Sequence, residues 1–252
     1  MSDYESTRKK FSDMITLYGR KPVLEILSDP GIAVFRLHLA SSNAASDILR
    51  QIETLAADRG IEIQYHDRPA LARISKNGRQ DQGVAVDVEP PGYRDIEAID
   101  TDCRELIALD GITNPQNLGM IIRTVAASPL EGLVLPKKGC ARINPLVHKA
   151  SAGTLFRAEI YHSPTLEHAI SRLKARDFEV IGLSGAAEKS IADISPVSPG
   201  SRVFLLGNES EGLRPNILEM CHETVAIPMA RDIESLNVTA AAALVAFRGL
   251  FS

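Results

Sequence analysis

The stretch "ELIALDGITNPQNLGMIIRTVAAS", residues 105–128, predicts a buried strand, a polar loop and an apolar helix in succession. Its first six residues have the pattern of a buried strand, the turn residues Asn114 and Pro115 follow, and the helical run begins at about Leu118. Four later runs have the same strand character, with helical segments between them: "GLVLP" (132–136), "FEVIGLS" (178–184), "RVFLLG" (202–207) and "TVAIPM" (224–229). This alternation predicts an α/β fold in which a mostly parallel sheet carries helices on both faces.

One charge, Arg123, stands in the middle of this helical run. The residues three and four positions away are Gly119, Met120, Ala126 and Ala127, so no carboxylate lies within reach on the same helix. Arg123 could pair with an acid from elsewhere in the chain, or extend its head group into solvent. The small neighbours instead suit close packing beside an arginine whose guanidinium needs an anion.

The residues before this stretch predict a separate, smaller α/β unit that closes near Glu89. Strand patterns occur in "VFRLHLA", "IEIQYH" and "GVAVDVE", and helical patterns occur in "SDILRQIETLAADRG" and "RPALARISK". The stretch "PPGYRD", residues 90–95, follows with two prolines, a glycine and mixed charges, which is typical of a linker. We therefore predict a first domain over residues 1–89, a linker over 90–101 and a second domain over 102–252.

The composition predicts a soluble, cytoplasmic protein without a structural metal. The chain has 252 residues and a net charge of -4, which disfavours a generally basic nucleic-acid coat but leaves local patches open. Its three cysteines lie far apart, and neither they nor the histidines have the spacing of metal ligands. The N-terminus lacks the apolar core of a signal peptide, and no apolar run approaches the roughly 18 residues of a membrane span.

Three loops at the carboxyl ends of the predicted strands form the candidate binding site: "DGITNPQN", "GNESEG" and "PMARDIESLN". Open α/β sheets bind their ligands at this edge. None of the loops has the glycine pattern of a dinucleotide site or a phosphate loop, and the chain contains no GxSxG. The loops therefore need an explanation other than these common signatures.

Taken in order, the loops resemble the three motifs of the SpoU (TrmH) group of RNA ribose 2′-O-methyltransferases in the SPOUT superfamily. The motifs are "NPQNLGMIIRT", "LLGNESEGL" and "IPMARDIESLNVTAAAALVAF". Nearer the front, "YGRKPVLEIL" and "DQGVAVDVEP" resemble the opening and the close of the L30e-like substrate-binding domain that often precedes this catalytic domain. Asp81, Ser210 and Arg231 depart from the family pattern, which usually has His, Gly and Gly at these positions.

The resemblance implies a trefoil-knotted SPOUT fold, S-adenosyl-L-methionine as cofactor, and homodimers that assemble the site between subunits. It also implies a catalytic set, which consists of Asn117, Arg123, Glu209, Ser235 and Asn237. In this set Arg123 would hold an RNA phosphate through two hydrogen bonds. It would then either promote deprotonation of the ribose hydroxyl or stabilise the developing alkoxide, although an arginine is itself a poor base.

Ordinary structural roles remain open for the other members of the catalytic set. Glu209 could complement the dipole of a helix that begins near Pro215. Asn117 and Asn237 have a residue type that caps helices, and Ser235 could be an ordinary loop hydroxyl. Cofactor contacts, made mainly by backbone groups, are implied by the resemblance at Gly207, Asn208, Ile227, Met229 and Leu236.

A positive segment lies between Glu131 and Glu159, where the sequence contains no acid. Its basic residues are Lys137, Lys138, Arg142, Lys149 and Arg157, with His148 nearby. Such a segment suits RNA phosphate, although a solvated loop with chance charge is the alternative.

These patterns predict an enzyme that uses S-adenosyl-L-methionine to methylate the 2′-hydroxyl of a ribose in structured RNA. Ribosomal RNA is favoured over transfer RNA by the L30e-like front domain. The alternative is a non-catalytic RNA-binding or ribosome-assembly factor on the same fold, but the complete catalytic set favours an enzyme. An oxidoreductase is disfavoured because its glycine fingerprint is missing.

Overall fold

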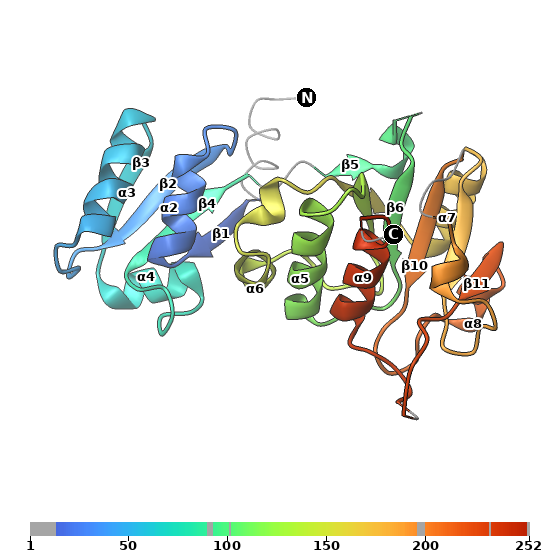
Figure 1. Cartoon of the computed structure of the whole chain (residues 1–252). Helices are drawn as coiled ribbons and strands as arrows, with labels where there is room; N and C mark the ends of the chain where they lie inside the picture. The colour runs from blue at the N-terminus through green and yellow to red at the C-terminus, as the bar shows by residue number, and fades with distance from the viewer. Residues whose placement is uncertain (1–13, 90–92, 101, 196–199, 232, 251–252) are drawn as a thin grey trace. The chain divides into compact units, whose positions relative to one another are not determined.

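The computed structural model of the chain describes residues 14–89, 93–100, 102–195, 200–231 and 233–250. The chain divides into two compact units between residues 92 and 93 (Figure 1). Residues 94–95, which the sequence assigned to the linker, form a strand of the second unit.

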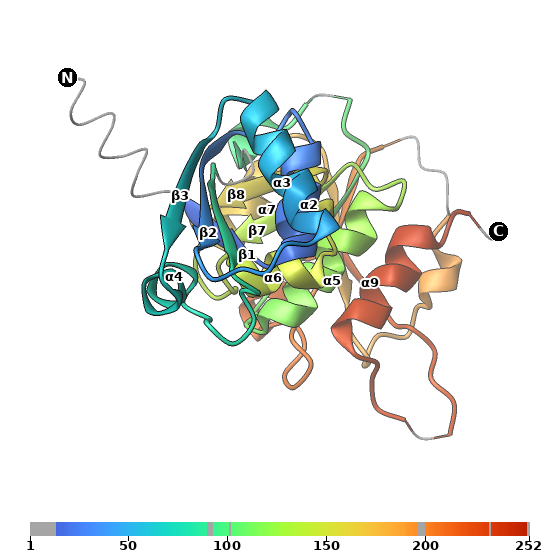
Figure 2. The same ribbon diagram turned by 90° about the vertical axis from the view of Figure 1, so that its left-hand side faces the viewer.

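In the first unit a four-stranded sheet has the order β1-β4-β2-β3. Strands β2 and β3 pair in parallel, and β4 pairs antiparallel with both β1 and β2. The elements are β1 (Ile15–Tyr18), α2 (Arg20–Ser28), β2 (Val34–Ala40), α3 (Asp47–Asp58), β3 (Glu62–His66), α4 (Arg68–Ser75) and β4 (Val84–Val88). Helices α2 and α3 pack against each other (Figure 2). Helix α4 places Leu71 against Ala40 and Ala85 of the sheet.

The second unit contains a seven-stranded sheet, counted over the described residues, with the order β11-β9-β10-β6-β7-β8-β5. All of its pairings are parallel. The elements are β5 (Arg94–Asp95), η1 (Ile96–Ala98), β6 (Glu105–Leu109), α5 (Pro115–Ala126), β7 (Gly132–Pro136), α6 (Pro145–Ala150), η2 (Thr154–Phe156), β8 (Ile160–Ser163), α7 (Leu166–Lys174), β9 (Glu179–Leu183), η3 (Ile191–Asp193), β10 (Arg202–Leu206), α8 (Pro215–Leu218), β11 (Glu223–Val225) and α9 (Val238–Phe247).

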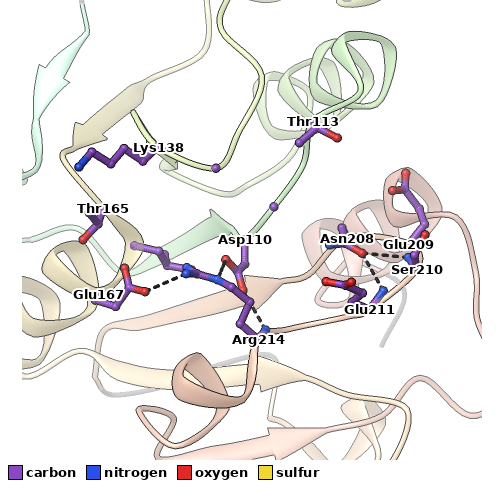
Figure 3. Close-up of a pocket in the computed structure, with 13 residues that line it drawn as sticks. Asp110, Thr113, Lys138, Thr165, Glu167, Asn208, Glu209, Ser210, Glu211 and Arg214 are labelled. Atoms are coloured by element: carbon purple, nitrogen blue, oxygen red, sulfur yellow. Dashed lines mark hydrogen bonds and ion pairs between the residues drawn. The ribbon is translucent and has the colours of Figure 1, made fainter.

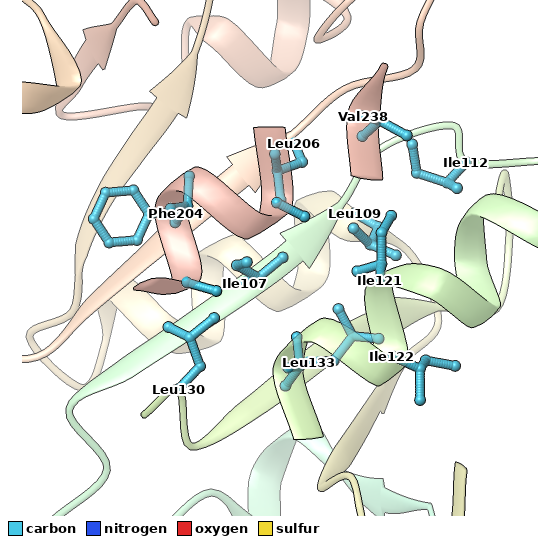
Figure 4. Packing of buried hydrophobic residues seen from close by; sticks show 14 of the residues in the cluster. Ile107, Leu109, Ile112, Ile121, Ile122, Leu130, Leu133, Phe204, Leu206 and Val238 are labelled. Atoms are coloured by element: carbon cyan, nitrogen blue, oxygen red, sulfur yellow. The ribbon is translucent and has the colours of Figure 1, made fainter. Parts of the chain in front are cut away.

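Alternating side chains build a core on each face of this sheet. Ile107 and Leu109 of β6 belong to one cluster, together with side chains of α5, α6 and α9. Leu106 and Ala108 belong to the other cluster, which includes side chains of α7 and α8. Figure 4 shows part of the first cluster, in which Ile107 and Leu109 of β6 pack with side chains of the helices. The predicted parallel sheet with helices on both faces is thereby confirmed.

Local chemistry sets the element boundaries that differ from the prediction. Helix α5 begins at Pro115 because the Asn114 side chain accepts a hydrogen bond from the backbone N–H of Gln116 and caps the helix. Strand β11 ends at Val225, three residues before Pro228, so the predicted strand over residues 224–229 is too long. Strands β5 and β8 have no counterpart in the sequence prediction.

Candidate active site

A pocket of about 360 Å³ opens at the carboxyl ends of β9 and β10, beside the start of α9. Its walls include all five residues that the sequence predicted for cofactor contact: Gly207, Asn208, Ile227, Met229 and Leu236. Ser235 and Glu209 of the predicted catalytic set also line it. Ser184 and Gly185, which follow β9, complete one side and were not predicted from the sequence. Residues from two separate motifs therefore meet around one cavity, which we call the cofactor pocket.

The loop over residues 207–213 forms one wall of the cofactor pocket and folds tightly on itself. The backbone N–H of Gly212 donates to the carbonyl of Asn208 at 3.0 Å. The Asn208 side-chain oxygen accepts from the backbone N–H groups of Ser210 at 2.9 Å and Glu211 at 2.7 Å. The amide of Asn208 is therefore used to shape the loop. Gly207 is required sterically, because a Cβ atom there would lie 2.0 Å from the carbonyl carbon of Gly212.

A second hollow of about 630 Å³ is lined in part by the same loop (Figure 3). It shares residues 208–211 with the cofactor pocket and is also lined by Asp110 after β6, Lys138 after β7 and Glu167 at the start of α7. We call it the neighbouring pocket. Lys138, Asn208 and Glu209 of this lining were predicted as site residues, whereas Thr165 and Glu167 lie outside the candidate loops and were not predicted.

Arg214 fastens the end of the 207–213 loop to the sheet. Its backbone N–H and its Nε atom donate to the two carboxylate oxygens of Asp110, at 3.0 and 2.8 Å, and its Nη1 lies 3.0 Å from Glu167 Oε1 (Figure 3). Burial acts to lower the pKa of Arg214, but the hydrogen bonds and charges of Asp110 and Glu167 outweigh it and raise the pKa. Asp110 is only 3% exposed, so its carboxylate depends on this partner.

The structure brings two members of the predicted catalytic set into contact. Asn117, in the first turn of α5, donates a hydrogen bond from Nδ2 to Oε1 of Glu209. These residues are far apart in sequence, and the contact joins the first motif to the second. Asn237 caps α9, because its side-chain oxygen accepts from the backbone N–H of Thr239 at 2.9 Å. The capping role considered for Asn237 is thus confirmed.

Arg123 stands apart from the other predicted catalytic residues. It lies six residues beyond Asn117 on α5, which corresponds to about 9 Å along the helix axis. Its side chain is exposed and lines neither of the two pockets. Within the described residues it makes no hydrogen bond or ion pair through its side chain. A partner acid, one of the ordinary explanations for this charge, is therefore not found there.

The positive segment between β7 and β8 is exposed at each of its predicted RNA-binding residues: Lys137, Lys138, Arg142, Lys149 and Arg157. His148 differs from them. It is buried, its ring packs edge-on against Phe156 with centroids 5.8 Å apart, and burial lowers its pKa to about 4. His148 therefore belongs to the core of this segment and is not part of its charged surface.

Two positions of the motifs are explained by backbone geometry. A Cβ atom on Gly119 would lie 2.5 Å from the carbonyl oxygen of Val147 and 2.5 Å from Cβ of Ala150, so a glycine lets α5 and α6 pack closely. Arg231 has a φ angle of 60°, in the left-handed region where glycine is the usual residue. The arginine thus adopts the backbone conformation that the family glycine would adopt without strain.

The described residues contain neither a metal-ligand cluster nor a helix that could cross a membrane. Among residues 14–89, 93–100, 102–195, 200–231 and 233–250, no three His, Cys, Asp or Glu side chains cluster as metal ligands would. Over the same residues, every helix is too short or too polar to span a bilayer.

Two family models match the chain, one over each unit. The model described as "SpoU rRNA Methylase family" matches residues 105–247. The model described as "RNA 2'-O ribose methyltransferase substrate binding" matches residues 16–94.

Relatives match nearly the whole chain. It is 33% identical over 247 residues to an "Uncharacterized tRNA/rRNA methyltransferase" of Mycolicibacterium gilvum, an alignment that covers 96% of this chain and 77% of that protein. A protein of Mycobacterium tuberculosis with the same description is 33% identical over 242 residues, which cover 94% of this chain and 74% of that protein.

Solved structures share the fold. The SpoU methyltransferase AviRb of Streptomyces viridochromogenes, in complex with AdoMet, superposes with a TM-score of 0.80 at 22% identity and covers 99% of this chain and 93% of its own. An AdoMet-bound rRNA methyltransferase of Sinorhizobium meliloti gives a TM-score of 0.77 at 23% identity, with 98% and 92% covered. The trefoil knot stays a prediction of the resemblance.

The resemblance seen in the three loops is confirmed by these matches, since one family model covers more than half of the chain. The chain belongs to the SpoU rRNA methylase family.

Proposed function

We propose that this protein binds S-adenosyl-L-methionine in the cofactor pocket and transfers its methyl group to the 2′-hydroxyl of a ribose in structured RNA. The observation that carries the proposal is the convergence of Gly207, Asn208, Ile227, Met229 and Leu236 on one pocket. The membership in the SpoU family and the 2′-O ribose description of the matching front domain support it. Ribosomal RNA is the favoured substrate, as the name of the family suggests, and transfer RNA is the alternative.

The cofactor pocket fits such a ligand. Its volume of about 360 Å³ lies within the roughly 300–1,000 Å³ typical of small-molecule sites. Gly207 removes a side chain where the backbone folds closest, and Leu206, Leu236 and Ile227 supply apolar walls. A bound S-adenosyl-L-methionine would supply an activated methyl group on a sulfonium.

The residues around the pocket would position the ribose and stabilise charge. The 2′-hydroxyl must lose its proton as the new bond forms, and a charged group nearby lowers the cost of that step. Glu209 is held by Asn117 at the edge of the cofactor pocket, where it can orient the ribose. Arginine is a poor base and carries its charge in a planar guanidinium that suits phosphate, so we assign Arg123 to holding an RNA phosphate and stabilising the developing negative charge.

We further propose that the complete site forms between two copies of the chain. Helices α5 and α9 lie side by side (Figure 1). Each exposes a large apolar residue, Met120 on α5 and Leu244 on α9, at 47% each. Arg123 is three residues from Met120 and therefore shares its face of α5. A symmetric contact through this face would bury the apolar residues and bring Arg123 toward the pocket of the second copy.

Calorimetric titration with S-adenosyl-L-methionine, with NADH as the control ligand, tests the proposed function. We expect heat of binding with the first ligand alone. Absence of binding, in the presence and absence of bulk RNA, would contradict the proposal and favour a non-catalytic RNA-binding factor. Sedimentation of the same sample tests the dimer, which a monomer at micromolar concentration would contradict.

A further inference from the structure

The neighbouring pocket adjoins the cofactor pocket and is the larger of the two. Its volume is about 630 Å³, against about 360 Å³, and residues 208–211 line both. Glu209, which accepts a hydrogen bond from Asn117, is one of these shared residues. A molecule in the neighbouring pocket would therefore lie next to the edge at which Glu209 can orient the ribose.

The charges of the neighbouring pocket disfavour a phosphate as its occupant. Among the described residues of its lining, carboxylates outnumber cations: the acids are Asp110, Glu167, Glu209 and Glu211, and the cations are Lys138 and Arg214. An anion would meet an excess of negative charge there. An uncharged ligand with hydrogen-bond donors would not.

Arg214 offers such a ligand a flat, charged surface. Its Nε donates to Asp110 at 2.8 Å and its Nη1 lies 3.0 Å from Glu167, so two carboxylates hold the guanidinium by its edges (Figure 3). The side chain is still 46% exposed, and it lines the neighbouring pocket. Within the described residues, the arginines that lie over aromatic rings are Arg94 and Arg248, so no protein ring covers the face of Arg214.

A nucleic-acid base matches this surface. Bases are uncharged planar rings, and proteins that recognise unpaired RNA nucleotides stack them on aromatic rings or arginine planes and hydrogen-bond their edges. Glu211 lines the same pocket and uses its backbone N–H within the loop, but its carboxylate has no hydrogen bond or ion pair within the described residues. It can accept from an exocyclic amino group, which adenine, guanine and cytosine have and uracil lacks.

We propose that the neighbouring pocket binds the base of the nucleotide whose ribose is methylated, with that base stacked on the guanidinium of Arg214. The inference rests on the proposed function and deepens it, because it adds a base site to the ribose and phosphate contacts. Arg214 and Glu211 are then specificity residues, which favour a base with an amino group over uracil.

NMR titration of the full chain with free nucleosides tests this site. S-adenosyl-L-homocysteine is added first, at saturation, so that adenosine cannot enter the cofactor pocket. The Nε–H signal of Arg214, which R214K identifies by its disappearance, should move upfield with adenosine, guanosine or cytidine, because a proton above an aromatic ring is shielded. Uridine should bind more weakly. Ribose 5-phosphate, which has no base, should leave the signal in place.

Two conservative variants separate stacking from charge. R214K keeps a cation beside Asp110 and the backbone N–H of residue 214, but it loses the planar surface. R172K is the matched control, because Arg172 is 47% exposed and pairs with an acid, Glu97, outside both pockets. R214K should weaken nucleoside binding in saturation-transfer NMR by a factor of roughly 2–30, and R172K should keep the wild-type affinity. Both variants should bind S-adenosyl-L-methionine as the wild type does.

An Arg214 signal that no nucleoside moves, or that ribose 5-phosphate moves as far as adenosine does, would overturn the inference. Equal nucleoside affinity in R214K and the wild type would overturn it too, and uridine binding as tight as that of cytidine would remove the role of Glu211. Should R214K not fold, sequential assignment through the backbone of Arg214 identifies the signal, and the wild-type titration still decides.

The proposed function is tested separately. It stands after any of these failures if the wild type binds S-adenosyl-L-methionine and methylates RNA. A wild type that binds neither S-adenosyl-L-methionine nor S-adenosyl-L-homocysteine would refute the proposed function, and the base site with it.

Discussion

Replacing Gly207 by alanine should close the cofactor pocket. The added Cβ would lie 2.0 Å from the carbonyl carbon of Gly212, 2.2 Å from its oxygen and 2.3 Å from the backbone nitrogen of Leu213. All three obstacles are backbone atoms, which cannot rotate away as a side chain does. Carbon atoms in contact prefer a separation of about 3.5–4.0 Å, so the loop must move by roughly 1.5 Å.

The cost of this movement sets the expected loss of affinity. Overpacking of this kind costs about 1–3 kcal/mol. If the ligand binds only to the original conformation of the loop, this strain is added to the free energy of binding. The dissociation constant for S-adenosyl-L-methionine then rises by a factor of roughly 5–150. Part of the strain can instead appear as a lower free energy of unfolding, which urea denaturation measures on the same sample.

Gly200→Ala is the matched control for this prediction. Gly200 is exposed, and no atom of the described residues lies within 4 Å of the place that a Cβ would take there. Calorimetric titration of both variants should show wild-type affinity for Gly200→Ala and weakened or lost binding for Gly207→Ala. Equal affinities in the two variants would refute the reasoning that places the cofactor against this loop.

Three further predictions concern single side chains. Arg123→Ala should leave S-adenosyl-L-methionine binding nearly intact in calorimetry while abolishing methyl transfer to RNA, and full activity would contradict the role given to this arginine. Arg214→Ala should lower the free energy of unfolding in urea at neutral pH by about 1–3 kcal/mol, because it removes the Nε donor and the positive charge from the buried Asp110 carboxylate and leaves only the backbone N–H of residue 214; an unchanged midpoint would contradict this. His148, with its pKa lowered to about 4 from a usual value near 6.5, binds fewer protons in the folded state than in the unfolded state between these values. The free energy of unfolding should therefore fall by about 3 kcal/mol through His148 as the pH drops from about 6.5 to 4. In His148→Phe this part of the pH dependence should be missing. An equal pH slope in the wild type and the variant would contradict this.

The fold followed from the sequence wherever the pattern of side chains was strong. The runs over residues 106–109 and 203–206 are apolar throughout, and both lie in central strands that are buried on two faces. Strand β8, "IYHS", is short and contains a histidine and a serine, so its pattern is too weak to predict. Strand β5 has two residues and exists only because it pairs with β8, a contact that no local pattern encodes.

The residues of the candidate site could be predicted from the family motifs, but hardly from the chemistry of the individual side chains. The five cofactor residues came from the resemblance, and the structure gathers them around one pocket. The contact between Asn117 and Glu209 joins residues 92 positions apart, and that between Asp110 and Arg214 joins residues 104 positions apart. Such pairs depend on the order of strands in the sheet. The separation of Arg123 from the pockets likewise depends on where α5 points, which its sequence does not show.

The atom of RNA that receives the methyl group distinguishes ribose methylation from base methylation and from mere RNA binding. The protein would be incubated with ribosomal RNA and S-adenosyl-L-methionine that carries an isotopically labelled methyl group, and the RNA digested to nucleosides for mass spectrometry. We expect label in one 2′-O-methylnucleoside, on the ribose, and none with Arg123→Ala. Label on a base, or no label from a protein that binds the cofactor and the RNA, would contradict it.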